Sequence, residues 1–460
     1  MKHLLIVTTN FPPASSIGTQ RILRISKYLS EERWKVSVLT LNERYSSGGR
    51  GRLDYPDRLA VHRTGKLDPV EVLLRLRGRL FGSGERDSEA GRMQATDKLM
   101  AAKREGKTEV RISRWQQFKD LVTDLLQFPD KQVSWIPPAL LYGWRLVRRD
   151  KVDVIFSSAP PHSILLLATL LKRVSGARLV IDFRDPWARS PWLTEVRNSS
   201  GYERFKTRLL ERFEHWVVNT ADSIVFVTPE MRDDFVRHYP ELPADKFQVF
   251  FNGFDPDNVP GLAPRQAAAG DGTGGPVTFV HTGTLYRRRD PTPMLRAVHN
   301  LLRRGEIDRG ELFMHFVGTV TPELAAVKDL VATLDLEGVV RFTPSVPYAE
   351  SLELMADSDV LILLQPVTHL QIPAKFYDYI CFEKPILAVC EPNGAVDNLV
   401  RGDFGVSVDY NSVTAQEAAI LTMLRHPFDP AIIRANRPRF DMSRAIAEFE
   451  SVLDPTHPPA

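Results

Sequence analysis

Cysteine is scarce in this sequence, and that scarcity excludes a disulfide-stabilised scaffold. The 460 residues include only two cysteines, Cys381 and Cys390, which lie nine positions apart and belong to no metal-ligand spacing. Extracellular disulfide scaffolds and structural zinc modules both require several cysteines at short spacings. We therefore expect two buried, reduced thiols in an intracellular protein, and no metal site.

Long apolar runs are missing as well. No stretch approaches the roughly 20 apolar residues that a membrane-spanning helix requires. The short apolar run at the N-terminus continues into residues 8–13, which are polar and then proline-containing and predict a first strand and its loop rather than a cleaved signal. We therefore expect a cytoplasmic protein, and association with the inner face of the cell membrane stays open.

Neither a strong net charge nor a dinucleotide fingerprint is present. The formal net charge is only +3, which excludes a generic nucleic-acid binder. The loop after the first expected strand holds a single glycine, Gly18, and no GxGxxG pattern. The sequence therefore lacks the main feature that would indicate an NAD-dependent oxidoreductase.

What the chain does contain is a regular alternation of apolar, β-branched runs with helix-period segments. Strands are expected at residues 4–9, 36–41, 152–158, 179–183, 224–227 and 249–251, and again at 277–281, 313–317, 339–342, 360–364, 386–389 and 406–408. Helical patterns lie between several of them, such as 21–29 and 163–174. Apolar strands separated by helices predict parallel sheets that are covered on both faces. The fold class is therefore α/β.

A stretch rich in glycine and proline, residues 259–276, divides this alternation in two and has the composition of a linker. We expect an N-terminal Rossmann-like domain over residues 1–258 and a C-terminal one over 277–437. Ligands of open α/β sheets bind beyond the carboxyl ends of the strands, so two facing sheets predict an active site in a central cleft.

An insertion at about residues 44–150 interrupts the first domain. It mixes arginine with leucine at 73–81 and 144–149, and the polar residues 83–110 between them predict a mobile loop. A basic amphipathic helix can lie on an anionic membrane surface. The alternative is that the leucines pack on the domain while the arginines stay solvated.

Two candidate sites in the first domain follow expected strands. Gly18 precedes a helix that we expect to start near Gln20, and a glycine there lets backbone amides approach an anion; a plain turn is the alternative. Arg184 and Asp185 lie in residues 182–187 (DFRDPW), directly after a strand. They could bind or polarise an acceptor hydroxyl, or merely pair with each other in a turn.

Two further candidates lie in the second domain. Gly283 follows a strand, and the amides around it could form a concavity for an anion. Of the three consecutive arginines that follow, we select Arg289 as the inward one, where a fixed cation would stabilise a departing diphosphate. Lys375 and Asp378 are three apart at the start of an expected helix and share a face. They could serve a phosphate and a ribose, or form a plain ion pair.

Taken in order, these segments resemble the family-4 glycosyltransferases, a retaining group with the GT-B fold. The segments that carry the resemblance are residues 11–13 (FPP) with Gly18, 182–187 (DFRDPW), 252–255 (NGFD), 283–286 (GTLY) and 372–379 (IPAKFYDY). The resemblance implies a nucleotide-diphosphate sugar as the donor substrate, with no cofactor and no metal ion. It also implies that residues 438–441 cross back to the first domain and that a final helix at 443–453 packs there.

The resemblance assigns roles to individual residues. Arg289 and Lys375 would hold the donor diphosphate, and Asp378 would grip the nucleotide ribose. Arg184 and Asp185 fall near the acceptor-side catalytic position. The remaining donor-binding residues that it implies are Gly18, Gly283, Thr284 and Gly394.

This sequence departs from the family pattern at three positions. Leu370 stands where the first of two glutamates is expected, Asp378 replaces the second, and Arg184 stands where many members have histidine. These departures indicate a divergent branch whose acceptor contacts differ.

The function that we predict is retaining, hexosyltransferase-type transfer of a sugar to a hydroxyl, in polysaccharide or glycoconjugate biosynthesis. The partners expected are a nucleotide-sugar donor and a saccharide acceptor, which would be lipid-linked if the insertion touches the membrane; no nucleic acid is expected. The alternatives are a nucleotide-sugar epimerase and a non-catalytic subunit that binds a nucleotide sugar.

Overall fold

The computed structural model describes residues 1–45, 53–67, 122–190, 193, 200–258 and 275–456. The predictions for residues 73–81 and 83–110, and for nearly all of the linker at 259–276, lie outside the described residues. The described residues group into two compact units, one of residues 2–15 and 35–179 and the other of Met1, 16–34 and 180–460.

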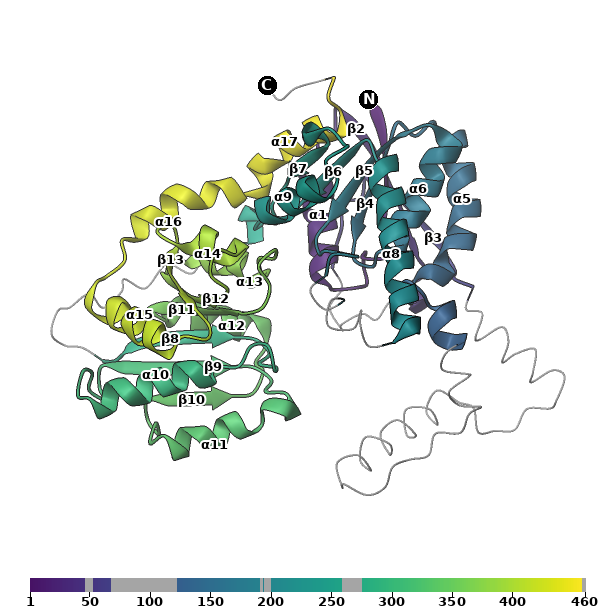
Figure 1. The fold of residues 1–460 in the computed structure, drawn as a ribbon. Helices are drawn as coiled ribbons and strands as arrows, with labels where there is room; N and C mark the ends of the chain where they lie inside the picture. Colours follow the sequence, from purple (N-terminus) through teal and green to yellow (C-terminus); the bar gives the residue numbers. More distant parts are fainter. Residues whose placement is uncertain (46–52, 68–121, 191–192, 194–199, 259–274, 457–460) are drawn as a thin grey trace. The chain divides into compact units, whose positions relative to one another are not determined.

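The strands form two parallel sheets, and in both the strand order reverses beside the first strand (Figure 1). The first sheet has the order β3-β2-β1-β4-β5-β6-β7 and the second β10-β9-β8-β11-β12-β13. The first contains β1 (Lys2–Val7), β2 (Trp34–Leu41), β3 (Ala60–Thr64), β4 (Val154–Ala159), β5 (Arg178–Phe183), β6 (Ser223–Phe226) and β7 (Phe247–Val249). The second contains β8 (Val277–Thr282), β9 (Leu312–Val317), β10 (Val340–Thr343), β11 (Val360–Gln365), β12 (Ile386–Cys390) and β13 (Gly405–Asp409). Both have the doubly wound order of Rossmann-like sheets, which confirms the expected fold class.

In the unit of residues 2–15 and 35–179, β1 pairs with β4 and β2 with β3, and α5 (Ile136–Arg149) packs on α6 (Ser163–Ser175). The last turns of α5 are the arginine- and leucine-rich residues 144–149. Leu146 and Val147 are buried there, whereas Arg148 and Arg149 are exposed. The apolar side chains of this part of the insertion are therefore used in packing.

The other unit begins with α1 (Ile17–Tyr28), which Ser16 caps by accepting the amide hydrogen of Thr19 at 3.1 Å. Its further elements before the second sheet are β5 to β7, α8 (Gly201–Thr220) and α9 (Pro229–His238). The last helix, α17 (Met442–Leu453), contacts α1. Glu450 of α17 accepts the amide hydrogen of Ser30 at 2.7 Å, which anchors the helix to the residues just after α1.

The central strands β11 and β12 of the second sheet are buried on both faces, which explains why they are almost entirely apolar. Ile362, Leu364 and Val389 belong to one hydrophobic cluster, whereas Leu361 and Ala388 belong to another. Successive residues of a strand point to opposite faces, so the two clusters cover the two sides. The helices of this part are α10 (Thr292–Arg303), α11 (Ala326–Thr333), α12 (Tyr348–Asp357), α13 (Lys375–Tyr379), α14 (Ala395–Val400), α15 (Val413–Arg425) and α16 (Pro430–Asn436).

Four local predictions need correction. The strand expected at 249–251 lies at 247–249, and β3 was not predicted because this strand is polar and only Thr64 in it is buried. The helix expected from Gln20 begins three residues earlier, because Ser16 caps it. The expected helix that contains Lys375 has a single α-helical segment of five residues, and a short 3-10 turn follows it.

Both cysteines are free, as expected, although only Cys390 is buried and Cys381 is half-buried. Burial raises the pKa of each thiol to about 12, so neither is a reactive thiolate near neutral pH. Among the described helices, none is long and apolar enough to cross a membrane.

Candidate functional site

The carboxyl end of β8 brings together two cations that lie far apart in the sequence. Lys375, the first residue of α13, extends to β8, where its Nζ donates to the carbonyl oxygen of Thr282. Arg289 approaches from the loop after the same strand, and its Nη2 donates to Oε1 of Gln365 at 3.1 Å. Gln365 is the last residue of β11, which is the next strand in the sheet. The loop, two strand ends and α13 therefore build one cationic cluster.

Because Gly283 has no side chain, Lys375 can reach the carboxyl end of β8. The backbone of Gly283 has a φ of +129°, and a β-carbon there would collide with Nζ of Lys375. Gly318 follows the neighbouring strand β9 and has a φ of +149°; a β-carbon at that position would collide with the backbone of Gly283. Both glycines are needed because backbone and lysine occupy the space that side chains would take.

Arg289 is the arginine that points into the cluster. Its guanidinium lies 5.3 Å from the ring centroid of Tyr286, and its Nε is buried with no hydrogen-bond partner. Arg287, two positions earlier, is exposed. The geometry agrees with the selection of Arg289 as the inward side chain.

The electrostatics of the cluster affect Lys375 and its neighbour His281. Burial, and then the charge of Arg289, lower the pKa of Lys375 to about 7. His281 is fully buried and its pKa lies well below the usual range, chiefly through burial and then through Lys375. Across the described residues, neither Lys375 nor Arg289 forms an ion pair with a carboxylate. This arrangement favours an anion with more than one charge as a ligand.

Asp378 lies one turn after Lys375 on α13 and is largely buried, which raises its pKa. It forms no ion pair with Lys375 in the described structure, so the plain ion pair considered above is not present. Leu370, where the family pattern has a glutamate, is only 5% exposed.

Fewer backbone amides are free around Gly283 than an anion-binding concavity would require. The amide hydrogen of Gly283 is donated to the carbonyl of Val317 at 2.7 Å, and that of Leu285 to Thr319 at 2.8 Å. Thr284 between them is exposed. Side chains, rather than a row of free amides, therefore supply most of the positive charge.

Gly394 lies apart from these contacts. It precedes α14, and a β-carbon there would approach the Cα of His369 to 3.0 Å. The amide hydrogen of Ala395 is donated to the carbonyl of His369 at 2.8 Å. The position of Gly394 is thus explained by close packing against the loop that precedes α13.

On the first sheet, the structure brings Gly18 and Arg184 together. A β-carbon at Gly18 would lie 2.5 Å from Nη1 of Arg184, so the guanidinium lies directly against the start of α1. Burial lowers the pKa of Arg184, and the nearby carboxylates of Asp182 and Asp185 oppose that shift. Burial raises the pKa of Asp185, while Arg184 opposes the rise.

Arg21 is a structural partner that the sequence did not single out. Its Nε and Nη2 donate to the two carboxylate oxygens of Asp182 at 2.8 and 2.9 Å, and both side chains are buried. Its Nη1 donates to the carbonyl of Phe251 and to Oδ1 of Asn252, each at 2.9 Å. Asp182 therefore anchors α1 and is not available for chemistry. In the sequence, this role is indicated by a single arginine on the apolar face of a helix.

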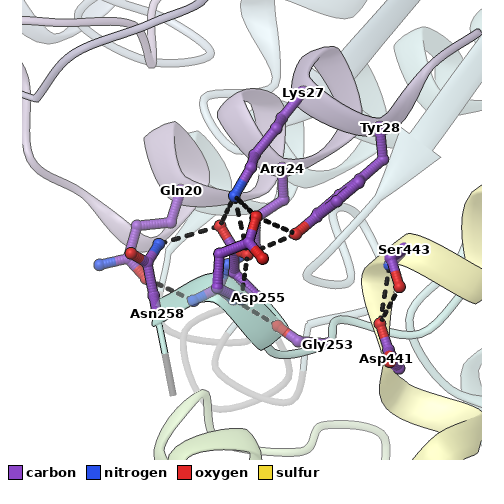
Figure 2. A network of polar contacts seen from close by, with 10 residues as sticks. Gln20, Arg24, Lys27, Tyr28, Gly253, Asp255, Asn258, Asp441 and Ser443 are labelled. Atoms are coloured by element: carbon purple, nitrogen blue, oxygen red, sulfur yellow. Dashed lines mark hydrogen bonds and ion pairs between the residues drawn. The ribbon is translucent and has the colours of Figure 1, made fainter. Parts of the chain in front are cut away.

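A second network holds α1 to the residues before the linker (Figure 2). Nζ of Lys27 lies 2.9 Å from the carboxylate of Asp255 and 2.6 Å from that of Asp257. The hydroxyl of Tyr28 donates to the same Asp255 at 2.5 Å, and Arg24 donates to the carbonyl of Gly253. The pairing lowers the pKa of Asp255, although burial alone would raise it.

No group of three or more histidine, cysteine, aspartate or glutamate side chains in the described ranges is placed to hold a metal ion.

The fold and this cationic edge define a protein of the GT-B class, with two Rossmann-like parallel sheets. A solved glycosyltransferase from Rickettsia africae aligns over 99% of this chain and 98% of its own, with a TM-score of 0.60 and 11% identity. Anabaena Alr3699/HepE in complex with UDP aligns over 99% of this chain and 100% of its own, with a TM-score of 0.57 and 13% identity. At such identities these likenesses establish the fold.

Two comparisons at the level of sequence find regions of this chain that are similar to known glycosyltransferases. The model of Glycosyltransferase Family 4 matches residues 104–258. A D-inositol 3-phosphate glycosyltransferase from Streptomyces griseus is 30% identical over 171 residues, which cover 33% of this chain and 36% of the relative. The matched region therefore spans about a third of that relative. Over these regions the chain is similar to Glycosyltransferase Family 4 and to this relative, and its fold is similar to that of a solved glycosyltransferase.

Proposed function

We propose that this protein is a glycosyltransferase that moves a sugar from a nucleotide-diphosphate donor to a hydroxyl of an acceptor, with retention of configuration. The observation that carries the proposal is the pair of Lys375 and Arg289 at the carboxyl end of β8, where Rossmann-like sheets bind ligands. The family match at residues 104–258 supports it, as does a fold neighbour solved in complex with UDP.

In this proposal the two cations act on the leaving group. Negative charge grows on the diphosphate as the bond to the sugar breaks, and fixed cations that already surround it stabilise that charge without reorganisation. Lys375 would carry its proton when the diphosphate is bound, because the anion offsets the repulsion from Arg289. Two side-chain cations of this kind would take the place of a metal ion, and no cofactor enters the reaction.

The remaining candidates have supporting roles. Asp378 is one turn from Lys375 and would accept hydrogen bonds from the nucleotide ribose. Arg184 and Asp185 would bind the acceptor hydroxyl, and the burial that raises the pKa of Asp185 suits a group that exchanges a proton. Gly18 lets the guanidinium of Arg184 lie against α1.

We infer a role in polysaccharide or glycoconjugate assembly, with a saccharide or lipid-linked acceptor. The exposed Arg148 and Arg149 at the end of α5 are the described part of the basic insertion that could contact an anionic membrane surface. The action would then take place at the inner face of the cell membrane.

The first experiment compares variants that share one loop. A thermal-shift screen with uridine, guanosine and thymidine diphosphates identifies the base, and the corresponding sugar nucleotides are then assayed with saccharide acceptors. Arg289→Ala and Lys375→Ala should each lower kcat/KM by about 100-fold or more. Arg287→Ala removes an exposed arginine of the same loop and should leave turnover unchanged. Unchanged activity in both cluster variants would overturn the donor-site assignment.

A non-catalytic subunit is the second candidate, because a buried Leu370 occupies the position of an expected glutamate. Such a subunit would bind a nucleoside diphosphate with the same dependence on Lys375 and Arg289. It would, however, show neither transfer to any acceptor in the panel nor hydrolysis of the donor.

A further inference from the structure

A pocket of about 690 Å³ lies between α8, α9 and the residues that follow β5, well separated in sequence from the cationic cluster at β8. Its lining includes three arginines, two glutamates and two histidines: Arg189, Arg208, Arg212, Glu211, Glu214, His215 and His238. Figure 1 shows α8 and α9 among the helices of the first sheet. The volume falls within the range of about 300–1,000 Å³ that is typical of small-molecule sites.

One wall of the pocket carries two arginines of α8, Arg208 and Arg212, with one carboxylate of the same helix, Glu211, beside them. Arg208 and Arg212 are four residues apart on α8, so they lie on the same face of the helix, and His215 continues that face. Both arginines are exposed, and neither forms a hydrogen bond or an ion pair through its side chain with any residue in the described part of the chain. Two adjacent guanidinium groups suit a phosphate, because each offers a planar fork of donors.

Two further lining residues, Arg189 and Glu214, are held by hydrogen bonds. The guanidinium of Arg189 forms a two-pronged ion pair with Asp234 of α9, at 2.5 and 2.9 Å. Glu214 is buried and accepts the amide hydrogen of Ala188 at 2.8 Å and the hydroxyl hydrogen of Tyr239 at 3.1 Å. Burial raises the pKa of Glu214 to about 7, so this carboxyl is only about half ionised at pH 7.

Arg189 also lies close in the chain to the acceptor-side segment. Ala188 and Arg189 follow Arg184 and Asp185 after an interval of two residues. A ligand that contacts Arg189 would therefore touch the segment that carries the candidate acceptor residues.

We propose that this pocket binds a phosphorylated saccharide, with its phosphate on Arg208 and Arg212. The phosphate supplies the two charges that the arginines complement, and the volume leaves room for a hexose beside Tyr239 and His215, whose rings stand 6.0 Å apart at a tilt of 34°. The assignment does not depend on the donor site and goes beyond the transfer reaction proposed above.

Isothermal titration of the full-length protein with glucose 6-phosphate, glucose and inorganic phosphate tests the proposal. Glucose 6-phosphate should bind the unsubstituted protein, glucose should not, and inorganic phosphate should bind at least tenfold more weakly than the sugar phosphate. The double variant Arg208→Ser/Arg212→Ser should lose at least tenfold in affinity for glucose 6-phosphate. Inorganic phosphate that binds as tightly as glucose 6-phosphate would overturn recognition of the saccharide.

The matched control is Arg204→Ser/Arg237→Ser, which removes two exposed arginines of α8 and α9 that do not line the pocket. It should bind glucose 6-phosphate like the unsubstituted protein. An equal loss of affinity in the control would show that net charge alone causes the effect, and it would overturn the proposal. Nucleoside diphosphate binding should persist in both double variants, which shows that they are folded. It also separates a failure of this pocket from a failure of the proposed donor site. Undiminished binding of glucose 6-phosphate to Arg208→Ser/Arg212→Ser would overturn the site.

Discussion

Lys375 is the residue whose protonation should report directly on donor binding. Its pKa of about 7 means that the free protein loses the lysine charge as the pH rises through neutrality. A bound diphosphate favours the charged form, so binding above pH 7 requires uptake of a proton. We expect the Kd for the preferred nucleoside diphosphate to rise between pH 7.5 and 9, by at most about tenfold per pH unit.

Lys375→Met is the reference for this measurement, because it keeps a long side chain without the charge. Its affinity should be weaker than that of the unsubstituted protein at pH 7 and should change little between pH 7.5 and 9. Titrations in buffers of different ionisation enthalpy should show proton uptake only when Lys375 is present. An equal pH dependence in Lys375→Met would assign the proton to another group.

Gly283 provides a second prediction at the residue scale. Gly283→Ala places a β-carbon where Nζ of Lys375 lies and forces alanine to a φ of +129°. Lys375 must then move away from the carbonyl of Thr282, and we expect the affinity for nucleoside diphosphate to fall by tenfold or more.

Gly310→Ala is the control for this variant. Gly310 belongs to the same part of the chain, and a β-carbon there would meet no atom within 4 Å. Its diphosphate affinity and thermal stability should match those of the unsubstituted protein. If Gly283→Ala binds diphosphate normally, Lys375 is not held against Gly283 in the ligand-bound protein.

At the scale of elements, α1 depends on polar anchors as much as on its apolar face. Asp255 is only 4% exposed and accepts hydrogen bonds from Lys27, Tyr28 and Asn258. Asp255→Asn removes the charge while keeping the shape, and it takes from Lys27 a buried carboxylate while the ion pair with the exposed Asp257 stays. We expect a loss of about 1–3 kcal/mol in the free energy of unfolding, measured in urea.

Asp257→Asn should cost less than about 0.5 kcal/mol, because the side chain of Asp257 is 67% exposed and water screens its ion pair. Similar destabilisation by the two substitutions would show that burial of Asp255 does not strengthen its contacts.

Element type was predictable from the sequence wherever burial was complete. The central strands β11 and β12 of the second sheet follow from their apolar runs, because a parallel strand buried on both faces has little room for polar residues. β3 escaped prediction because it lies at the end of its sheet and only one of its five residues is buried. The start of α1 depended on a single cap at Ser16, a local hydrogen bond that apolar periodicity does not report.

The site was predictable in part. Gly283 and Arg289 could be selected because they follow a strand end, and Lys375 because it begins an expected helix; the structure brings the three together. Gln365 was missed although it ends an apolar strand with a polar side chain, which is a usable signal. Arg21 and its partner Asp182 lie 161 positions apart, and only the folded sheet pairs them. Free backbone amides are not present at Gly283 and Leu285, because their hydrogens are donated to the carbonyl oxygens of Val317 and Thr319.

At the scale of the whole molecule, the pH dependence of stability should carry a distinct contribution from Glu214. Burial raises the pKa of this carboxyl from its ordinary value of 4.5 to about 7, so the folded protein binds a proton that the unfolded chain has already lost. The folded state therefore loses stability as the pH rises from about 4.5 to 7. The shift corresponds to about 3 kcal/mol at most.

Glu214→Gln isolates this contribution, because glutamine keeps an acceptor for Ala188 without ever ionising. The difference in unfolding free energy between Glu214→Gln and the unsubstituted protein should shift in favour of the variant from pH 5 to pH 8. Glu241→Gln, which changes an exposed carboxyl just after α9, should show no such trend. A difference that stays constant across this range would mean that Glu214 ionises in the folded protein as it does in the unfolded chain. The lost or retained hydrogen bonds to Ala188 and Tyr239 would then account for the whole effect of the substitution.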